Sequence, residues 1–203
     1  MDSEFSYRWR MMSESERAET LRDRKANLHP WHSPPHRETV DGRYLITAAC
    51  YEHAPLIGTS VKRLASFESD LLDICREFTT AVWAWAILPN HYHVLLEAPV
   101  VSELLRALGQ LHGRTSYVWN SEDAMRGRKV WHGAVETAMK SERHFWATIN
   151  YIHNNPVKHG YVACWQDWPF GNAGEYIDEI GRDEAERVWR AYPVGEYGDA
   201  WDY

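Results

Sequence analysis

Cysteine is scarce in this chain of 203 residues, and the three that are present, Cys50, Cys75 and Cys164, lie far apart. Their spacing argues against a disulfide framework and against a zinc site built from paired thiolates. An apolar run of the roughly 20 residues that span a bilayer is also lacking. The first residues, Met1–Phe5, contain neither the charged nor the apolar region of a signal peptide. We therefore expect a cytoplasmic protein that does not insert into a membrane.

A polybasic patch is lacking as well, and the formal net charge is −7. Residues 175–203 contain nine acidic and three basic residues, so this segment accounts for −6 and residues 1–174 for only −1. The acidity is therefore a carboxyl-terminal property, and it does not exclude a nucleic-acid partner for the rest of the chain. We expect three parts: an amino-terminal appendage over residues 1–40, a folded domain over 41–174 and an acidic tail over 175–203.

The hydrophobic pattern of the folded domain predicts the order strand, helix, two strands joined by a tight turn, helix, strand. The strands are expected over residues 43–50, 81–88, 91–98 and 129–135, and the two helices are expected to be capped near Ser60 and by Ser102. This order is typical of the ferredoxin-like split βαβ sandwich, an α+β fold with a central antiparallel sheet. In this topology the strand over 91–98 is central.

Further helices are expected outside this core pattern. One is capped by Ser141, follows the fourth strand, and should end near Asn155, because the residue before a proline avoids the helical conformation. Short helices are also expected over residues 13–27, before a proline-stiffened arm at 30–36, and over 182–192.

Two histidines in the third predicted strand are the first candidates for a functional site. Successive side chains of a strand point to opposite faces, so His91 and His93 project from one face and can converge on one metal ion, whereas Tyr92 points the other way. Two histidines on a strand are, by themselves, more often surface residues than ligands. Residues elsewhere in the chain must decide between these interpretations.

The helix capped by Ser141 carries a second candidate pair. Tyr151 and Asn155 are four residues apart, so they lie about 40° from each other around the helix axis, beside the apolar stripe. A tyrosine at such a boundary is usually an amphipathic packing residue. A tyrosine that faces a metal ion is instead a candidate nucleophile.

Two motifs resemble the paired signatures of the REP-associated tyrosine transposases, which are single-tyrosine members of the HUH superfamily of single-strand DNA nucleases. The first motif is Pro89-Asn90-His91-Tyr92-His93, followed by an apolar strand, and the second is Tyr151-Ile152-His153-Asn154-Asn155-Pro156-Val157-Lys158. The resemblance covers about residues 40–175, including Val130-Trp131 and Trp168-Pro169-Phe170. It does not extend to the first forty residues or to the acidic tail.

This resemblance implies an enzyme that cleaves and rejoins single-stranded or hairpin DNA of repetitive extragenic palindromes, the chemistry of DNA transposition and recombination. His91, His93 and Asn155 would hold Mg²⁺ or Mn²⁺, leaving open positions for phosphate oxygens. Tyr151 would attack the scissile phosphate and form a 5′-phosphotyrosine intermediate. Because that link conserves the bond energy, rejoining would need no ATP.

A polar stripe on the helix that follows Ser102 is a candidate DNA contact. Arg106, Gln110 and Arg114 recur at steps of four residues and form either a solvated face or a surface that follows the phosphate backbone. Two other functions are open on the sequence: a domesticated protein that binds hairpin DNA without cleaving it, and a metal-dependent hydrolase that uses water in place of tyrosine. Monomer and homodimer are equally open.

Overall fold

The computed structural model describes residues 13, 15, 22 and 42–195. Residues 42–195 all belong to one unit of the chain, Glu38–Tyr197. The helix expected over 13–27 and the arm expected over 30–36 lie outside the described residues, apart from single positions. Neither prediction is therefore tested.

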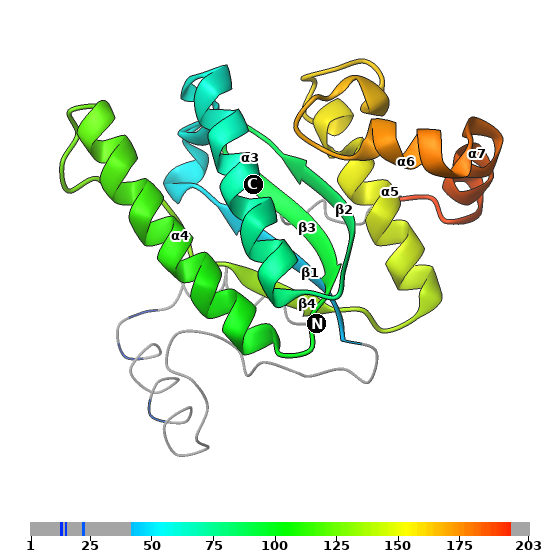
Figure 1. The fold of residues 1–203 in the computed structure, drawn as a ribbon, viewed down its shortest axis with the longest axis horizontal. Helices are drawn as coiled ribbons and strands as arrows, with labels where there is room; N and C mark the ends of the chain where they lie inside the picture. Colours follow the sequence, from blue (N-terminus) through cyan, green and yellow to red (C-terminus); the bar gives the residue numbers. More distant parts are fainter. Residues whose placement is uncertain (1–12, 14, 16–21, 23–41, 196–203) are drawn as a thin grey trace. The chain divides into compact units, whose positions relative to one another are not determined.

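Four antiparallel strands form the sheet: β1 (Arg43–Ala49), β2 (Ala81–Ile87), β3 (His91–Glu97) and β4 (Val135–Ala138). Their order is β2-β3-β1-β4 (Figure 1). Only a short turn separates β2 from β3, and the N–H of Leu88 closes it by donating to the carbonyl oxygen of His91 at 2.8 Å. The ferredoxin-like α+β fold is confirmed, and β3 is one of the two central strands.

The fourth strand was expected over residues 129–135, and this range is wrong. β4 begins only at Val135, and the earlier segment contributes a single bridge, between Trp131 and Cys50. The physical reason lies in the partner strand, because β1 ends at Ala49 and the chain turns into the 3-10 helix η1 (Tyr51–His53). The β-forming side chain of Trp131 packs into the core instead.

Two helices, α3 (Val61–Phe78) and α4 (Val101–Glu122), cover one face of the sheet (Figure 1). A second 3-10 helix, η2 (Ile57–Thr59), precedes α3, and the Ser60 hydroxyl accepts the N–H of Arg63 as the expected cap. Ser102 is not a cap, because α4 begins one residue earlier and has no side-chain cap. The core between these helices and the sheet consists mainly of aliphatic and aromatic residues, such as Ile46, Phe67, Leu71, Tyr92, Val94, Leu104 and Trp131.

The helix α5 (Glu142–Lys158) contacts β2 and β3 on the other face. Ser141 caps it by accepting the N–H of His144 at 3.1 Å, as expected. The helix does not end near Asn155 but continues through Pro156. Proline in the last turn removes one backbone hydrogen bond, and the carbonyl oxygens of Asn155 and Pro156 still accept the N–H groups of His159 and Tyr161.

The remaining described elements are the 3-10 helix η3 (Trp165–Asp167), α6 (Ala173–Ile180) and α7 (Arg182–Ala191), and α7 matches the short helix expected there. The first part of the predicted acidic tail is thus helical. The amide of Asn150 on α5 donates to the carbonyl oxygen of Tyr192 at 2.8 Å and joins α7 to α5. Within the described residues, no helix has the length and apolar character needed to cross a membrane.

Candidate active site

The two histidines of the first motif lie on β3 and point to the face of the sheet that α5 covers. The ring centroids of His91 and His93 are 5.0 Å apart. Tyr92 points to the other face and joins the core under α3 and α4. Both histidines are buried, with exposed fractions of 3% and 0%. The alternation of the strand therefore holds two imidazoles side by side, and they are called the histidine pair below.

Neighbouring side chains fix the orientation of both imidazole rings. Thr47 on β1 is the cross-strand partner of His93, and its Oγ1 lies 2.8 Å from Nδ1 of that ring. Oδ1 of Asn90 lies 2.8 Å from Nδ1 of His91. Nδ1 of each ring makes one of these hydrogen bonds, and Nε2 of each ring is directed toward α5. Metal-binding histidines are commonly held in this way by a hydrogen bond at the other nitrogen.

Tyr151 and Asn155 face the histidine pair from α5. The phenol oxygen of Tyr151 lies 3.2 Å from Nε2 of His93, and Oδ1 of Asn155 lies 2.9 Å from Nε2 of His91. Both α5 side chains are buried, with exposed fractions of 1% and 0%. The structure therefore brings together all four residues that the two motifs single out.

The donor atoms fit a divalent cation. A neutral imidazole donates from one nitrogen only, so if Nδ1 of His91 donates to Asn90, the lone pair of Nε2 faces the amide oxygen of Asn155. Nε2 of His91 and Oδ1 of Asn155, which lie 2.9 Å apart, are atoms of the types that would hold a divalent cation. Nδ2 of Asn155 is buried without a partner among the described residues.

The candidate metal donors, His91, His93 and Asn155, include no carboxylate. Among the described residues, no three side chains of the His, Cys, Asp and Glu types are grouped so that they could hold a metal ion. A cation at the histidine pair would therefore depend on the neutral amide oxygen of Asn155 as its third protein ligand. Without a carboxylate, we expect modest affinity for Mg²⁺ in the absence of a phosphate ligand.

Two residues beyond Asn155 also reach the site, and the sequence analysis missed them. Nζ of Lys158 lies 5.7 Å from the ring centroid of Tyr151, and the ring centroid of His159 lies 5.1 Å from that of His91. Both were missed because the helix was expected to end near Asn155. In a helix that continues, Lys158 is seven residues after Tyr151 and His159 is four after Asn155, so each lies on the same face as its predecessor.

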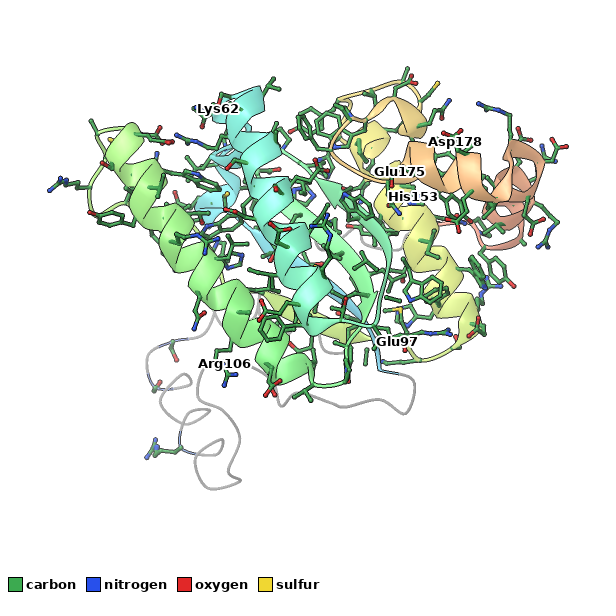
Figure 2. The ribbon with its side chains drawn as sticks, in the orientation of Figure 1. Lys62, Glu97, Arg106, His153, Glu175 and Asp178 are labelled. Carbon is green, nitrogen blue, oxygen red and sulfur yellow. The ribbon has the colours of Figure 1, made fainter. Side chains whose placement is uncertain are left out.

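The stripe of Arg106, Gln110 and Arg114 lies in a different layer. All three side chains are exposed on α4, which covers the face of the sheet opposite to the histidine pair. Figure 2 labels Arg106 at the end of α4, away from α5. Arg114 also forms an ion pair with Asp70 of α3 at 3.3 Å. The structure therefore does not bring these three residues to the site.

A cationic and aromatic cluster lies closer to the site, at the end of β1. Nζ of Lys129 lies 4.5 Å from the ring centroid of Tyr51, which is 5.1 Å from that of His132. The N–H of His132 donates to the carbonyl oxygen of Ala49, whose partner across the sheet is His91. The backbone of His132 therefore lies about two strand spacings, on the order of 10 Å, from that of His91. These three residues are called the edge cluster below.

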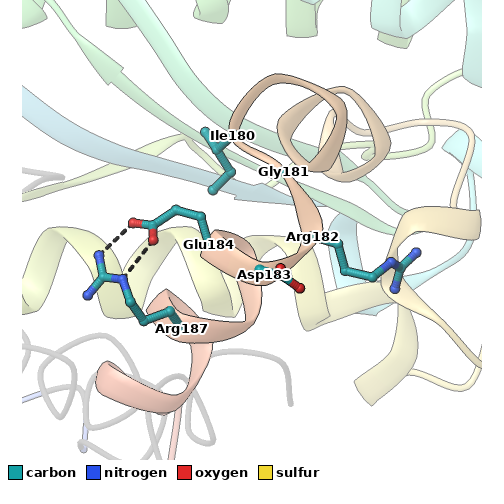
Figure 3. Close-up of a pocket in the computed structure, with 6 residues that line it drawn as sticks. All are labelled: Ile180, Gly181, Arg182, Asp183, Glu184 and Arg187. Carbon is teal, nitrogen blue, oxygen red and sulfur yellow. Dashed lines mark hydrogen bonds and ion pairs between the residues drawn. The ribbon is translucent and has the colours of Figure 1, made fainter.

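A surface hollow at the junction of α6 and α7 is not part of this site. It is lined by Ile180, Gly181, Arg182, Asp183, Glu184 and Arg187 (Figure 3). Glu184 accepts hydrogen bonds from Nε and a terminal nitrogen of Arg187, so the two charges offset each other.

The antiparallel sheet carries the histidine pair on a central strand, and α5, which follows β4, places Tyr151 beside it. The family model described as "Transposase IS200 like" matches residues 44–155, which is more than half of the chain, and the chain belongs to this family. The matched range begins in β1 and ends at Asn155. It therefore contains His91, His93, Tyr151 and Asn155.

Known relatives agree with this family. A REP-associated tyrosine transposase of Escherichia coli (strain K12) is 26% identical over 134 residues, which cover 66% of this chain and 72% of that protein. A relative from Haemophilus influenzae (strain ATCC 51907 / DSM 11121 / KW20 / Rd) is 26% identical over 151 residues, which cover 66% of this chain and 81% of the relative. The resemblance drawn from the two motifs is confirmed.

A solved structure agrees with the fold. It is the structure of a REP-associated tyrosine transposase bound to a REP hairpin, and it matches with a TM-score of 0.56 at 19% identity. The match covers 71% of this chain and 84% of the other. At this identity the likeness shows the fold alone.

Proposed function

We propose that the protein is a metal-dependent single-strand DNA endonuclease and strand transferase in which Tyr151 is the nucleophile. The observation that carries this proposal is the 3.2 Å separation between the phenol oxygen of Tyr151 and Nε2 of His93. It supports the proposal because a phenol oxygen lies beside side-chain atoms of the types that coordinate divalent cations.

The proposed reaction is a phosphoryl transfer in two reversible steps. The phenol oxygen of Tyr151 bonds to phosphorus, and the bond between phosphorus and the 3′ oxygen of the upstream strand breaks. The phenol releases its proton, and the leaving oxygen takes one up and becomes a 3′-hydroxyl. The downstream strand stays attached through a 5′-phosphotyrosine. Attack by another 3′-hydroxyl reverses the step and joins two strands without ATP.

The surrounding residues have separate roles in this proposal. His91, His93 and Asn155 would hold Mg²⁺ or Mn²⁺, which when bound neutralises charge on the phosphate. The ammonium group of Lys158, 5.7 Å from the ring centroid of Tyr151, attracts the negative charge that develops on the phenol. Because Tyr151 is buried, a phosphate reaches it only after the groups that cover it have moved.

Hairpin or palindromic single-stranded DNA is the proposed substrate. The relative with the same fold is described as bound to a REP hairpin, which supports a DNA hairpin as partner for this chain. The edge cluster is the proposed contact for the strand next to the scissile phosphate. Its aromatic ring and ammonium group provide the stacking and phosphate contacts that single strands use.

The test is a cleavage reaction with Mn²⁺ and a palindromic single strand labelled at its 3′ end. We expect the label to enter a slow-migrating covalent adduct on a denaturing gel, because the downstream strand is the one that stays attached. Tyr151→Phe should abolish the adduct, whereas the control Tyr161→Phe should retain it. An adduct that survives in Tyr151→Phe would show that another residue is the nucleophile.

The same gel separates the alternative functions. Binding of the strand without either adduct or cleavage would indicate a domesticated hairpin-binding protein. Cleavage without an adduct, unaffected by Tyr151→Phe, would indicate a hydrolase that uses water.

A further inference from the structure

The strand β2 lies at the edge of the sheet, and a side chain beyond α5 bonds to its outward backbone groups. Oδ1 of Asn172 accepts the N–H of Trp85 at 2.9 Å, and Nδ2 of the same amide donates to the carbonyl oxygen of Trp83 at 3.1 Å. Unpaired groups on an edge strand need such partners. The two contacts also fix which end of the amide is oxygen.

The amide oxygen of Asn172 contacts α5 as well. Nε2 of His153 lies 3.1 Å from this oxygen. Because the oxygen is identified by the N–H that Trp85 donates to it, His153 must donate from Nε2, which assigns its tautomer. Nδ1 of His153 is then unprotonated, and it is buried without a partner among the described residues. Among the described residues, the polar contact of this ring is therefore the hydrogen bond to Asn172.

His153 lies on the back of α5 relative to the site. It follows Tyr151 by two residues, which corresponds to about 200° around the helix axis. Its ring stacks on Trp165 at 5.5 Å and contacts Tyr176 at 4.8 Å. Figure 2 labels His153 on α5, on the side that faces α6. The ring thus connects α5 to the segment that covers the edge of β2.

The backbone before Asn172 approaches β2 more closely than a side chain would permit. A Cβ added at Gly171 would lie 2.7 Å from the carbonyl oxygen of Trp85. The N–H of Asn172 donates to this same oxygen at 3.3 Å. Glycine is therefore required at position 171, and its close approach holds Asn172 in place against the strand.

We infer that the hydrogen bond between His153 and Asn172 positions α5 against the sheet and thereby sets where Tyr151 and Asn155 meet the histidine pair. The inference rests on the proposed role of Tyr151. Neither His153 nor Asn172 touches the reacting atoms, so both are positioning residues. Asn172 also lies beyond residues 44–155, the range that the family model matches.

The expected effect follows from helix geometry. A side-chain atom about 6 Å from the helix axis moves by about 1 Å when the helix turns by about 10°. A misplacement of about 1 Å can lower a reaction rate about 100-fold. A small rotation of α5 is therefore enough to separate the phenol oxygen of Tyr151 from its place beside His93.

The test uses the full chain with His153→Phe, His153→Gln and Asn172→Ala. Phenylalanine keeps the ring contacts without the donor, and glutamine can place an amide N–H near the position of Nε2. We expect His153→Phe and Asn172→Ala to slow single-turnover adduct formation by about 10- to 100-fold and to change the dissociation constant for the DNA by less than about 3-fold. His153→Gln should recover most of the rate. The double variant should be no slower than either single variant.

The matched control is Asn150→Ala. Asn150 is also a buried amide on α5, but it bonds to Tyr192 after α7, and α7 is not part of the sheet. The Asn150→Ala variant should have a lower melting temperature but should form the adduct at the unmodified rate. An unchanged rate in His153→Phe would overturn the inference, as would a loss of rate in Asn150→Ala equal to that in His153→Phe.

A second readout needs no DNA chemistry. Mn²⁺ binding to the DNA-free variants, measured by electron paramagnetic resonance, should weaken in His153→Phe and recover in His153→Gln, because Asn155 moves with the helix. If the unmodified protein forms no adduct while this pattern of Mn²⁺ binding holds, the proposed nucleophile fails and the positioning role stands. If adducts form and His153→Phe matches the unmodified protein in both measurements, the positioning role fails alone.

Discussion

The phenol oxygen of Tyr151 lies 3.2 Å from Nε2 of His93, although the two residues are 58 positions apart in the chain. A helix on one face of the sheet supplies the phenol, and a central strand supplies the imidazole. The contact joins the two motifs into one site.

Metal binding should depend on the asparagine as much as on the histidines. We expect His91→Ala and Asn155→Ala each to weaken Mn²⁺ binding at least about 10-fold, because each removes one of three protein donors. Asn155→Asp should strengthen it, because a carboxylate adds charge to the oxygen ligand. Isothermal titration with Mn²⁺ measures both effects. If all three variants bind Mn²⁺ with the affinity of the unmodified protein, the cation binds elsewhere.

Thr47 should influence the metal without touching it. Its hydroxyl contacts Nδ1 of His93 at 2.8 Å, and loss of such an orienting hydrogen bond costs about 10- to 100-fold in metal affinity. We therefore expect Thr47→Val to weaken Mn²⁺ binding by about 10-fold with little change in stability. Thr137→Val, at a half-buried threonine on β4, is the control and should bind Mn²⁺ normally.

The DNA strand should follow the edge cluster and not the polar stripe on α4. We expect Lys129→Ala to weaken binding of a palindromic single strand and to reduce the slope of log affinity against log salt concentration by about 1, because one phosphate contact is lost. Arg106→Ala should change neither value. Fluorescence anisotropy at several salt concentrations measures both. If Arg106→Ala weakens binding and lowers the slope while Lys129→Ala changes neither, the DNA lies on the face covered by α3 and α4.

Stability should fall at acidic pH because of a buried histidine in the core. Burial lowers the pKa of His112 to about 4, below its ordinary value of 6.5, so the unfolded chain binds the proton more tightly. The stabilisation is complete above pH 6.5 and is lost as the pH falls toward 4. When the pH is lowered from 7 to 4.5, we expect protonation of this residue in the unfolded chain to reduce the unfolding free energy by about 2 to 3 kcal/mol.

Chemical denaturation across this pH range measures the loss. His112→Gln retains a group that can hydrogen-bond to Tyr92, which lies 3.1 Å from Nε2 of His112, but has no proton to take up. Its unfolding free energy should therefore fall less steeply with acid. If the unfolding free energy of His112→Gln depends on pH as steeply as that of the unmodified protein, His112 does not cause the loss of stability in acid.

Local periodicity was sufficient for most of the fold. Alternation placed His91 and His93 on one face of a strand, and a spacing of four placed Tyr151 and Asn155 on one face of a helix. The start of β4, the cap of α4 and the end of α5 were predicted wrongly, and the first of these depends on another part of the chain. β4 could not extend to Trp131 because its partner β1 ends at Ala49.

The residues around the site were harder to predict. Thr47 reaches His93 only through the register between two strands, which no short motif records. Lys158 and His159 were missed because Pro156 was expected to end the helix, whereas α5 continues through it. The family resemblance supplied the roles of the four motif residues, and physical reasoning from spacing alone supplied only their faces.

The central claim is that Tyr151 itself becomes linked to DNA. The most direct measurement is mass spectrometry of the proteolysed adduct formed with Mn²⁺ and a palindromic single strand, after nuclease trimming of the DNA. We predict that a peptide containing Tyr151 carries the mass of a 5′-linked nucleotide and that fragmentation localises it to this tyrosine. A nucleotide found on any other residue, or an adduct linked through a 3′ phosphate, would contradict the account.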